Sequence, residues 1–573
     1  MSHHTSRFVP IIIAISVVVG IFIGTFFANR FSGNRLHIIN TSSNKINDLL
    51  HFIDDKYVDT VDISDIVERA MPSILAELDP HSSYISVQAA KTANDDLKGS
   101  FSGIGVQFQI KSDTVYVSNI IKGGPAEKVG ILAGDRIVTI NDSSYVGKVV
   151  TNEETLHRLK GEKGTKVKLG IVRHGSAKPL SFTVVRGDIP VKSIDATYMI
   201  DNSLGYIKIS KFGETTYPEM LIALASLEQE GFKGLVIDLR GNNGGYMESA
   251  IKMVNEFLPE DKLIVYTEGR KMKREDYFSD GRGAYQKLPL IVLTDEFSAS
   301  ASEIFAGAIQ DNDRGIIVGR RTFGKGLVQQ PIELSDGSII HLTVSRYYTP
   351  SGRCIQKPYS KGNDPQYELD LVTRYQHGEF FNEDSIRQTG QVYKTAIGRT
   401  VYGGGGIMPD YFVAEDTTEF TSYYEEVAQK GLISQFCFEY SDNNRKALQQ
   451  YTTADDIVKY LRNNRVTQKF IEYCDKKGVK RRNNMILRSQ RLIENVVYGN
   501  IIYSILEMSD YVEYTNRNDV TVKRALDLFH SGLTFPKNNT KLNDKTRNQK
   551  TACNGVQTTL RKWRFSRMEQ IRC

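Results

Sequence analysis

The sequence predicts a multidomain protein of the α/β class, because apolar runs typical of buried strands alternate with segments of helical spacing. Leu288–Leu293 is a short apolar run of this kind, and Ala299–Ile309 behind it has helical composition. A second buried strand, Lys233–Arg240, runs into a glycine turn. On either side of this core, Leu97–Arg186 is a series of short strands and turns, whereas Thr418–Phe535 carries Leu, Ile and Tyr at helical spacing.

The composition of the 573 residues is that of an ordinary globular protein, with 40% apolar and 24% charged residues. The net charge of +6 arises in the tail Lys537–Cys573, which holds ten basic and two acidic residues. The remaining body therefore offers no basic groove for nucleic acid. The five cysteines show no C-x-x-C spacing, and neither H-E-x-x-H nor a phosphate-loop motif occurs, so neither a metal site nor a cofactor is expected.

Phe8–Phe27 is a run of twenty residues without a charge. At about 1.5 Å per residue a helix of this length spans a hydrocarbon layer of roughly 30 Å. A cleaved signal peptide is the competing interpretation, but Phe26 stands two residues before the best small residue, Ala28, and is too bulky for a cleavage site. We expect an uncleaved membrane anchor, whose orientation is not fixed because both flanks are basic.

Asn44–Ala90 is amphipathic and helical over much of its length, with a turn-like break at Leu78–Tyr84, L-D-P-H-S-S-Y. His81 in this break is either a functional group or a structural turn histidine. We expect the structural role.

The β-rich segment Leu97–Arg186 resembles a PDZ domain, through its G-I-G-V loop and its L-A-G-D-R-I turn at Leu132–Ile137. PDZ domains bind a peptide C-terminus by strand addition, while N–H groups of a loop hold the terminal carboxylate. The resemblance implies a carboxylate-binding loop made of Gly103, Ile104, Gly105 and Val106. The alternative is a spacer of the same fold that binds nothing.

Three serines, Ser298, Ser300 and Ser302, lie where the strand Leu288–Leu293 gives way to a helix. A helix N-terminus offers free N–H groups that suit a developing oxyanion. Further on, Lys325 stands between glycines, and no acidic residue occurs from 314 to 332. A buried lysine without a carboxylate partner loses its proton easily. The pattern predicts a Ser–Lys nucleophile and base, without choosing among the three serines.

A glycine turn, Gly241–Gly245, follows the buried strand Lys233–Arg240. Glycines allow bare backbone N–H groups to come close to a ligand. We interpret the turn as the second half of an oxyanion site; the alternative is a plain tight turn.

Five motifs of this chain resemble, in the same order, those of the carboxyl-terminal processing (tail-specific) proteases, serine peptidase family S41. They are D-L-R-G-N-N-G-G, S-A-S-A-S-E-I-F-A-G-A-I-Q-D, G-R-R-T-F-G-K-G-L-V-Q, Y-Y-T-P-S-G-R and G-G-G-G-I-M-P-D. The L-D-P-H-S segment and the PDZ-like domain also stand in the family's order. The resemblance covers residues 44–410 and implies a crotonase/ClpP-like α/β catalytic core.

The resemblance also implies roles for single residues. The nucleophile falls on Ser300, and the general base falls on Lys325, 25 positions later. Gln329, one helical turn beyond the lysine, would orient its amine. The oxyanion would be bound by backbone N–H groups, namely those of Ala301 and of either Gly244 or Gly245.

Three further expectations accompany this assignment. Ser298 is the expected N-cap of the helix, with Ser302 inside its first turn. Arg320 and Arg321 are expected to add like-charge pressure on the lysine. His341, the alternative base, is expected to be a structural strand histidine.

The chain divides into six predicted parts. These are a cytoplasmic stub with the transmembrane anchor (1–30), an N-terminal helical region (31–95), a PDZ domain (96–187), the S41 serine peptidase core (188–417), a helical C-terminal region (418–535) and a basic tail (536–573).

The sequence therefore predicts a single-pass membrane serine endopeptidase whose catalytic part lies outside the cytoplasm. Its substrates would be proteins or peptides with free, apolar C-termini, and Arg186, at the border of the PDZ domain, would relay their binding. No nucleic acid, metal or cofactor is expected, and homo-oligomer formation stays open. One alternative is a catalytically silent PDZ scaffold that binds protein C-termini. Another is an acyltransferase or hydratase, which is disfavoured because crotonase-like chemistry normally uses carboxylates.

Overall fold

The computed structural model describes residues 42–536, except 112, 174, 177, 363–364 and 387–389. The contacts divide the chain into two units, one that runs to Leu75 and one that begins at Ala76. The first contains α2 (Ser42–Lys56) and most of α3 (Ile63–Ala76). In the part of the chain that the structure describes, no helix is both long and apolar enough to span a membrane. The predicted anchor Phe8–Phe27 lies outside that part.

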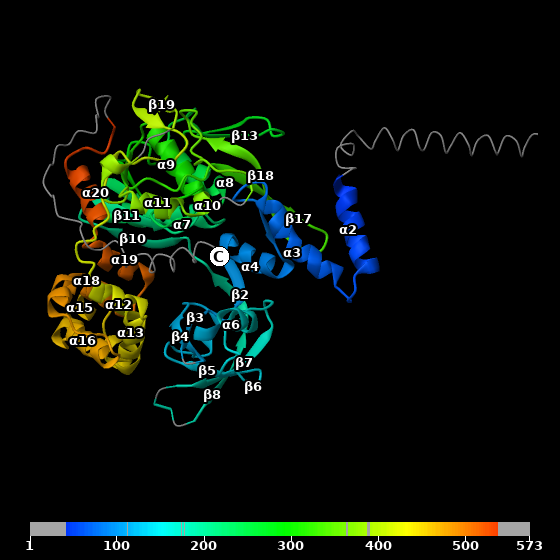
Figure 1. Cartoon of the computed structure of the whole chain (residues 1–573). Coiled ribbons are helices and arrows are strands. Elements are labelled where there is room, and N and C mark those ends of the chain that lie inside the picture. Colours follow the sequence, from blue (N-terminus) through cyan, green and yellow to red (C-terminus); the bar gives the residue numbers. More distant parts are fainter. Residues whose placement is uncertain are drawn as a thin grey trace, which may run out of the picture. The chain divides into compact units, whose positions relative to one another are not determined.

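A six-stranded sheet forms the centre of the second unit, in the order β10-β11-β12-β15-β16-β21 (Figure 1). β10 is antiparallel to β11, and all other neighbours are parallel. The bounds are β10 (Ile194–Met199), β11 (Leu204–Ile209), β12 (Gly234–Asp238), β15 (Leu290–Thr294), β16 (Ile316–Gly319) and β21 (Tyr411–Phe412).

Both faces of this central sheet are buried, which explains why its strands are continuous apolar runs. On β12, Leu235 and Ile237 belong to the cluster formed with α7, α8 and α9, whereas Val236 between them packs in the cluster with α20. Successive side chains of a strand point to opposite faces, so each strand needs apolar residues throughout. These helices are α7 (Thr216–Glu230), α8 (Met247–Asn255), α9 (Ala301–Asp311) and α20 (Val520–His530).

A second, five-stranded sheet has the order β1-β18-β13-β14, with β17 also paired to β18. Its strands come from distant parts of the chain: β1 (Ser83–Ile85), β13 (Leu263–Glu268), β14 (Glu275–Phe278), β17 (Leu327–Glu333) and β18 (Ile339–Tyr348). After β18 the chain continues with α10 (Pro365–Glu368), α11 (Asp370–Gln376), the 3₁₀ turn η1 (Glu383–Ser385), and the hairpin of β19 (Val392–Lys394) and β20 (Thr400–Tyr402).

The β-rich domain has its own sheet, β3-β4-β5-β7-β8, with β6 paired to β5, and its own hydrophobic core. Its elements are β3 (Val106–Lys111), β4 (Thr114–Ile120), α5 (Pro125–Lys128), β5 (Arg136–Ile140), β6 (Ser143–Ser144), α6 (Asn152–Leu159), β7 (Lys166–Val172) and β8 (Leu180–Val185). α4 (Val87–Lys98) precedes it, and the pair β2 (Ser100–Gly103) and β9 (Gly187–Pro190) joins its two ends. β3 is an edge strand of the sheet.

The C-terminal region is helical and packs around a separate hydrophobic cluster. Its helices are α12 (Ser422–Gln429), α13 (Leu432–Asn443), α14 (Arg445–Leu448), α15 (Ala454–Asn463), α16 (Val466–Lys476), α17 (Asn483–Arg488), α18 (Gln490–Tyr503) and α19 (Met508–Asn516). The last helix, α20, leaves this cluster: Val522, Ala525 and Leu528 pack on the central sheet instead.

Candidate active site

The three serines are distinguished by what their hydroxyls contact. Ser298 and Ser302 are fully buried, and their hydroxyls donate to the carbonyls of Leu239 (2.8 Å) and Asn242 (2.9 Å). Ser300, in contrast, is partly exposed and stands at the N-cap of α9. The expectation that Ser298 caps the helix is therefore wrong: Ser300 is the N-cap, and the Ser298 hydroxyl is bound to the Leu239 carbonyl just after β12.

Ser300 has an unusual backbone conformation, with φ of 56° and ψ of −115°. A non-glycine residue in such a region costs on the order of 1–3 kcal/mol and persists only where the surrounding structure enforces it. The strand β15 ends at Thr294, and α9 begins at Ala301. The sharp turn between them presents the Ser300 side chain at the start of the helix.

A buried carboxylate, Glu303, holds the serine and the lysine together. Its Oε2 accepts hydrogen bonds from the backbone N–H groups of Ser300 (2.9 Å) and Lys325 (2.8 Å). Its Oε1 accepts from the Gly324 N–H (2.7 Å) and the Thr322 hydroxyl (2.5 Å). Two segments that are distant in sequence are therefore fixed on the two oxygens of one side chain.

Tyr347 of β18 reinforces this junction from the other side. Its hydroxyl donates to the carbonyl of Ser300 (3.1 Å) and also lies against the carbonyl of Lys325. The ring is buried. The backbones of both residues are thus held by Glu303 at their N–H groups and by Tyr347 at their carbonyls.

The surroundings of the lysine favour its neutral form. Burial lowers the pKa of the Lys325 amine, while the carboxylates of Glu303 and Asp79 partly oppose this. Burial also raises the pKa of Glu303 to about 7, against the hydrogen bonds that it accepts. The acid-free sequence around Lys325 was misleading, because both carboxylates come from elsewhere in the chain.

The neighbouring arginines do not press on the lysine as expected. Arg320 pairs with Glu296 at 2.7 Å, and Arg321 pairs with Glu379 at 2.6 Å. Both guanidinium charges are thereby neutralised locally, and burial is the main cause of the lowered lysine pKa. The prediction of like-charge pressure is wrong.

The glycine turn lies directly against the serine. A Cβ atom added to Gly244 would stand 2.7 Å from the Ser300 Cβ and 3.0 Å from the Ala301 nitrogen. The N–H of Gly244 donates to the Asn242 Oδ1 (2.8 Å), and its carbonyl accepts from the Phe212 N–H (2.9 Å). In the described part of the chain no hydrogen bond uses the N–H of Gly245. Of the two glycines, Gly245 is therefore the one with a donor to spare.

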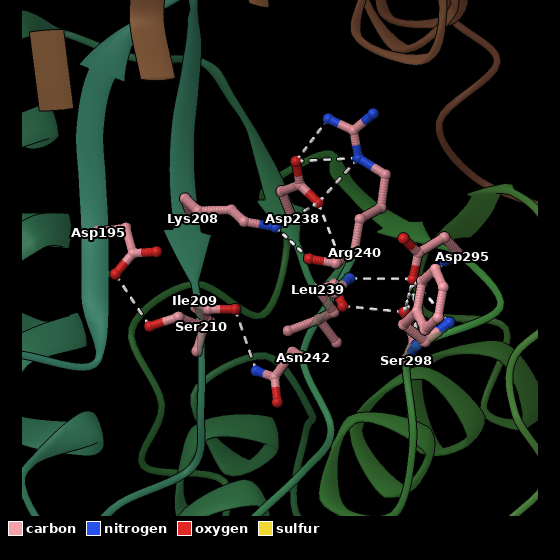
Figure 2. A network of polar contacts seen from close by, with 12 residues as sticks. Asp195, Lys208, Ile209, Ser210, Asp238, Leu239, Arg240, Asn242, Asp295 and Ser298 are labelled. Atoms are coloured by element: carbon pink, nitrogen blue, oxygen red, sulfur yellow. Dashed lines mark hydrogen bonds and ion pairs between the residues drawn. The ribbon is translucent and has the colours of Figure 1, made fainter. Parts of the chain in front are cut away.

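Polar contacts lock this turn to the ends of three strands (Figure 2). The Gly241 N–H donates to the Asp295 Oδ1 (2.9 Å), and the Asn242 amide donates to the Ile209 carbonyl (3.0 Å). Arg240 binds the Asp238 carboxylate at 2.7 Å. Burial disfavours ionisation of Asp238, yet the charges of Arg240 and Lys208 hold its pKa below the ordinary value. The turn is thus fixed at the carboxyl ends of β11, β12 and β15.

Comparisons with known proteins agree with this arrangement. The model of peptidase family S41 matches residues 203–369, and that of the PDZ domain matches residues 102–184. The chain is 37% identical over 317 residues to the carboxy-terminal-processing protease of Bartonella bacilliformis, which covers 54% of this chain and 72% of that protein. It belongs to peptidase family S41.

Other relatives carry names of the same kind. The carboxy-terminal processing protease CtpB of Bacillus subtilis is 38% identical, with 56% of this chain and 66% of that protein covered. Among solved structures, the photosystem II D1 C-terminal processing protease is 28% identical, covers 55% of this chain and 85% of its own, and has a TM-score of 0.32. The helices at 423–507 match a family of unknown function. The chain is thus a serine-type S41 peptidase with a PDZ domain.

Gln329 of this S41 peptidase lies on β17, so the lysine and the glutamine are not separated by a helical turn. Its amide nitrogen donates to the Thr343 hydroxyl at 3.2 Å. Thr343 in turn donates to Asp79 at 3.0 Å. The role of Gln329 toward the lysine stays a prediction. The contacts that the structure gives its side chain lead to Thr343 and, through Thr343, to Asp79.

The L-D-P-H-S segment also lies at this site. From the sequence, only His81 of this segment was considered, and Asp79, whose charge acts on Lys325, was missed. Burial, followed by the charge of Lys325, lowers the pKa of His81 to about 3, so this histidine is neutral. Its Nε2 is 2.6 Å from the Tyr367 hydroxyl. His341 on β18 is half-buried, and burial and the same lysine lower its pKa. For both histidines, burial and the charge of Lys325 thus favour the neutral form.

The predicted carboxylate loop lies between β2 and the edge strand β3. Gly103 ends β2, Ile104 is buried in the domain core, Gly105 has φ of 80°, and Val106 begins β3. The carbonyls of Ile104 and Gly105 accept from Ala126 (2.8 Å) and Ile121 (3.0 Å). These contacts fix the loop next to an open strand edge.

Arg186 binds the end of α6 within the PDZ domain. Its guanidinium donates to the carbonyls of Arg158 (2.8 Å) and Leu159 (3.1 Å) and to the Thr165 hydroxyl (3.1 Å). The proposed relay from Arg186 to the catalytic core stays a prediction.

Proposed function

We propose that this S41 peptidase is an endopeptidase that uses Ser300 as nucleophile and Lys325 as general base. The observation that supports this most is the bridge of Glu303, which binds the backbone N–H groups of both residues. A carboxylate that accepts from both N–H groups holds the two backbone segments close together, which supports a dyad of these residues. Burial of the lysine amine supplies the lowered pKa that a base near neutral pH requires.

The reaction begins when the neutral amine of Lys325 takes the proton of the Ser300 hydroxyl. The serine oxygen attacks the scissile carbonyl, and the N–H groups of Ala301 and Gly245 bind the resulting oxyanion. The tetrahedral intermediate then expels the amine of the leaving peptide, which receives the proton from Lys325. Water attacks the acyl-enzyme with the lysine again as base, and the acid product leaves Ser300 free.

Substitution of both residues tests the dyad. Ser300→Ala and Lys325→Ala are each expected to abolish turnover of a fluorogenic peptide while leaving the thermal unfolding curve unchanged. The double variant should lose little more than either single variant, because the residues act as a unit. Turnover by Lys325→Ala near that of the wild type would contradict the dyad and point to His341.

The same assay separates this proposal from the catalytically silent PDZ scaffold. A scaffold binds peptides with a free C-terminus but does not cleave them, whatever residue stands at 300. Cleavage that disappears with Ser300→Ala would exclude it. Binding without cleavage in the wild type would favour it.

We further propose that the PDZ domain selects substrates by their C-termini. β3 is an edge strand to which a peptide strand could be added, and the Gly103–Val106 loop stands at its start. A terminal carboxylate would lie on the N–H groups of this loop. Apolar final residues would suit the strand, because Val106 and Phe108 pack against the domain core.

The N-terminal run Phe8–Phe27 is proposed to stay attached as a single-pass anchor that places the catalytic part outside the cytoplasm. Its length and the poor cleavage site before Ala28 support this. Mass spectrometry of the mature N-terminus and alkaline extraction of membranes test it. A mature chain that starts near Asn29 would show a removed signal peptide instead.

A further inference from the structure

The L-D-P-H-S segment, Leu78–Ser82, leads directly into the five-stranded sheet although it precedes Lys325 by more than 240 positions. The strand that follows it, β1, pairs antiparallel with β18, so that Ser83 lies opposite His341. Asp79 and Ser82 are buried, with 5% and 7% of their surface exposed. A buried carboxylate needs hydrogen-bond donors, and the contacts of Asp79 reveal where it acts.

The carboxylate of Asp79 accepts hydrogen bonds from four donors, and one of these, the Thr343 hydroxyl, also contacts Gln329. Its Oδ1 accepts from the N–H groups of His81 and Ser82, both at 2.9 Å, and its Oδ2 accepts from the Ser82 hydroxyl at 2.6 Å. The Thr343 hydroxyl donates to Oδ1 at 3.0 Å. The Thr343 N–H in turn donates to the Ser82 oxygen at 3.1 Å. Thr343 and the segment are therefore clamped by two reciprocal contacts.

Counting the available protons gives the direction of the hydrogen bonds that link Asp79, Thr343 and Gln329. An ionised carboxylate only accepts, so the single hydroxyl proton of Thr343 must go to Asp79. The Thr343 oxygen can then only accept from Gln329, whose Nε2 lies 3.2 Å away. The two ends of a glutamine amide are chemically distinct, and the network decides which end points where. With Nε2 on Thr343, the carbonyl Oε1 of Gln329 points to the other side of the amide, and among the described residues it accepts no hydrogen bond.

We propose that Asp79 is a positioning residue of the catalytic centre: through Thr343 it sets the amide of Gln329 so that its carbonyl oxygen accepts a hydrogen bond from the Lys325 amine. This rests on the proposed Ser–Lys function. An amine that donates to this acceptor keeps its lone pair directed at the serine proton, whereas a flipped amide would donate to that lone pair and compete with the serine proton for it.

The charge of Asp79 acts on the lysine as well. It raises the pKa of Lys325, as Glu303 does, against the larger effect of burial. The other titratable groups that interact with this lysine are His81 and His341, whose pKa values it lowers. Removal of the Asp79 charge should therefore lower the lysine pKa further, and the acid limb of the pH profile should shift to lower pH.

The experiment compares Asp79→Asn, Thr343→Val and Thr343→Ser in cleavage of one fluorogenic peptide across pH. Asp79→Asn can donate to Thr343 and so frees the Gln329 amide to flip; we expect kcat to fall roughly tenfold with KM nearly unchanged, the loss of one directed hydrogen bond. Its acid limb of kcat/KM should move to lower pH. Thr343→Val should lower kcat similarly without this shift, because the charge of Asp79 remains. Thr343→Ser should keep an activity close to that of the wild type, because serine retains the hydroxyl group.

Two comparisons keep a merely structural effect apart. Ser83→Ala, at the exposed residue directly after the segment, should retain wild-type turnover. Asp79→Asn combined with Gln329→Ala should be no slower than Gln329→Ala alone, because both break one chain. Additive losses in that double variant, or equal losses in Thr343→Ser and Thr343→Val, would overturn the proposal. Activity of Lys325→Ala would instead overturn the dyad itself.

Discussion

The catalytic centre and the PDZ domain are held in place by different kinds of interaction. Around the serine and the lysine the contacts are buried: Glu303 has no exposed surface, and the ion pair of Asp311 with Arg353 behind α9 has none on either side chain. The ion pairs that join the PDZ domain to the C-terminal helices are partly or largely exposed. In the ion pair of Lys122 and Glu507, 79% and 54% of the side-chain surfaces are accessible.

This difference indicates which part of the molecule can shift. Breaking a buried ion pair costs roughly 3–5 kcal/mol, whereas an exposed pair is worth about 0–1 kcal/mol. α13 lies beside β3 and β4 (Figure 1), where Lys111 pairs with Glu439 and Tyr116 packs edge-on against Phe438. These contacts indicate that the catalytic centre is held more firmly than the PDZ domain, and we expect a shift of the PDZ domain to cost little free energy.

The rigidity of the catalytic centre is tested most strongly at Gly244. A methyl group there would stand 2.7 Å from the Ser300 Cβ, closer than real Cβ atoms come, so Gly244→Ala must displace the serine. A misplacement of about 1 Å costs on the order of a hundredfold in rate. Gly241→Ala is the matched control, since it lies in the same turn, also has positive φ, and meets nothing within 4 Å. We expect kcat to fall at least a hundredfold for Gly244→Ala and much less for Gly241→Ala; equal losses would show that backbone strain, not contact with Ser300, is responsible.

A smaller loss is expected for Glu303→Gln. The amide has one acceptor oxygen, so one pair of donors, either Ser300 and Lys325 or Thr322 and Gly324, faces an NH₂ group. Each unsatisfied buried donor costs about 1–3 kcal/mol. We expect a fall in kcat of roughly tenfold to a hundredfold, with KM little changed, from steady-state kinetics.

Retained kcat in a folded Glu303→Gln variant would show that the bridge does not hold the dyad. Circular dichroism and thermal unfolding provide the control for folding. A rise in KM of similar size, with kcat unchanged, would show that the substitution acts on substrate binding instead.

Sequence patterns predicted the parts of this site whose information is local. The apolar runs at Lys233–Arg240 and Leu288–Leu293 became buried parallel strands, because burial on both faces leaves a continuous signature. The helix after the serines followed from its composition. The capping error at Ser298 was avoidable, since Ser300 and Glu303 form the S-x-x-E pattern of a capping box.

The remaining parts depend on contacts between distant segments. No local pattern ties Glu303 to Gly324, or Asp79 to Thr343, because each pair meets only when the chain is folded. The charge environment of Lys325 was misjudged for the same reason. A window of sequence without acids does not describe a pocket that two remote carboxylates enter.

The role of the PDZ domain is tested with a pair of matched substrates that differ only in a C-terminal carboxylate or amide. A hydrogen bond to a charged group is worth on the order of 1.5–3 kcal/mol. We therefore expect roughly a tenfold or greater loss of kcat/KM for the amide at low substrate concentration. Equal cleavage of both would mean that the Gly103–Val106 loop reads no carboxylate and that the PDZ domain has another role.

The smallest effect is expected where the PDZ domain meets α13. Glu439→Lys places two like charges at the 2.5 Å contact with Lys111, yet both side chains are about one-third exposed. The unfolding free energy should change by about 1 kcal/mol or less, and more weakly at high salt. Cleavage of the carboxylate substrate should change only a few-fold, and Lys111→Glu in the same chain should reverse the change. If Glu439→Lys instead lowered kcat as strongly as Glu303→Gln, the PDZ domain would be clamped as firmly as the catalytic centre, and peptide binding could not act by moving it.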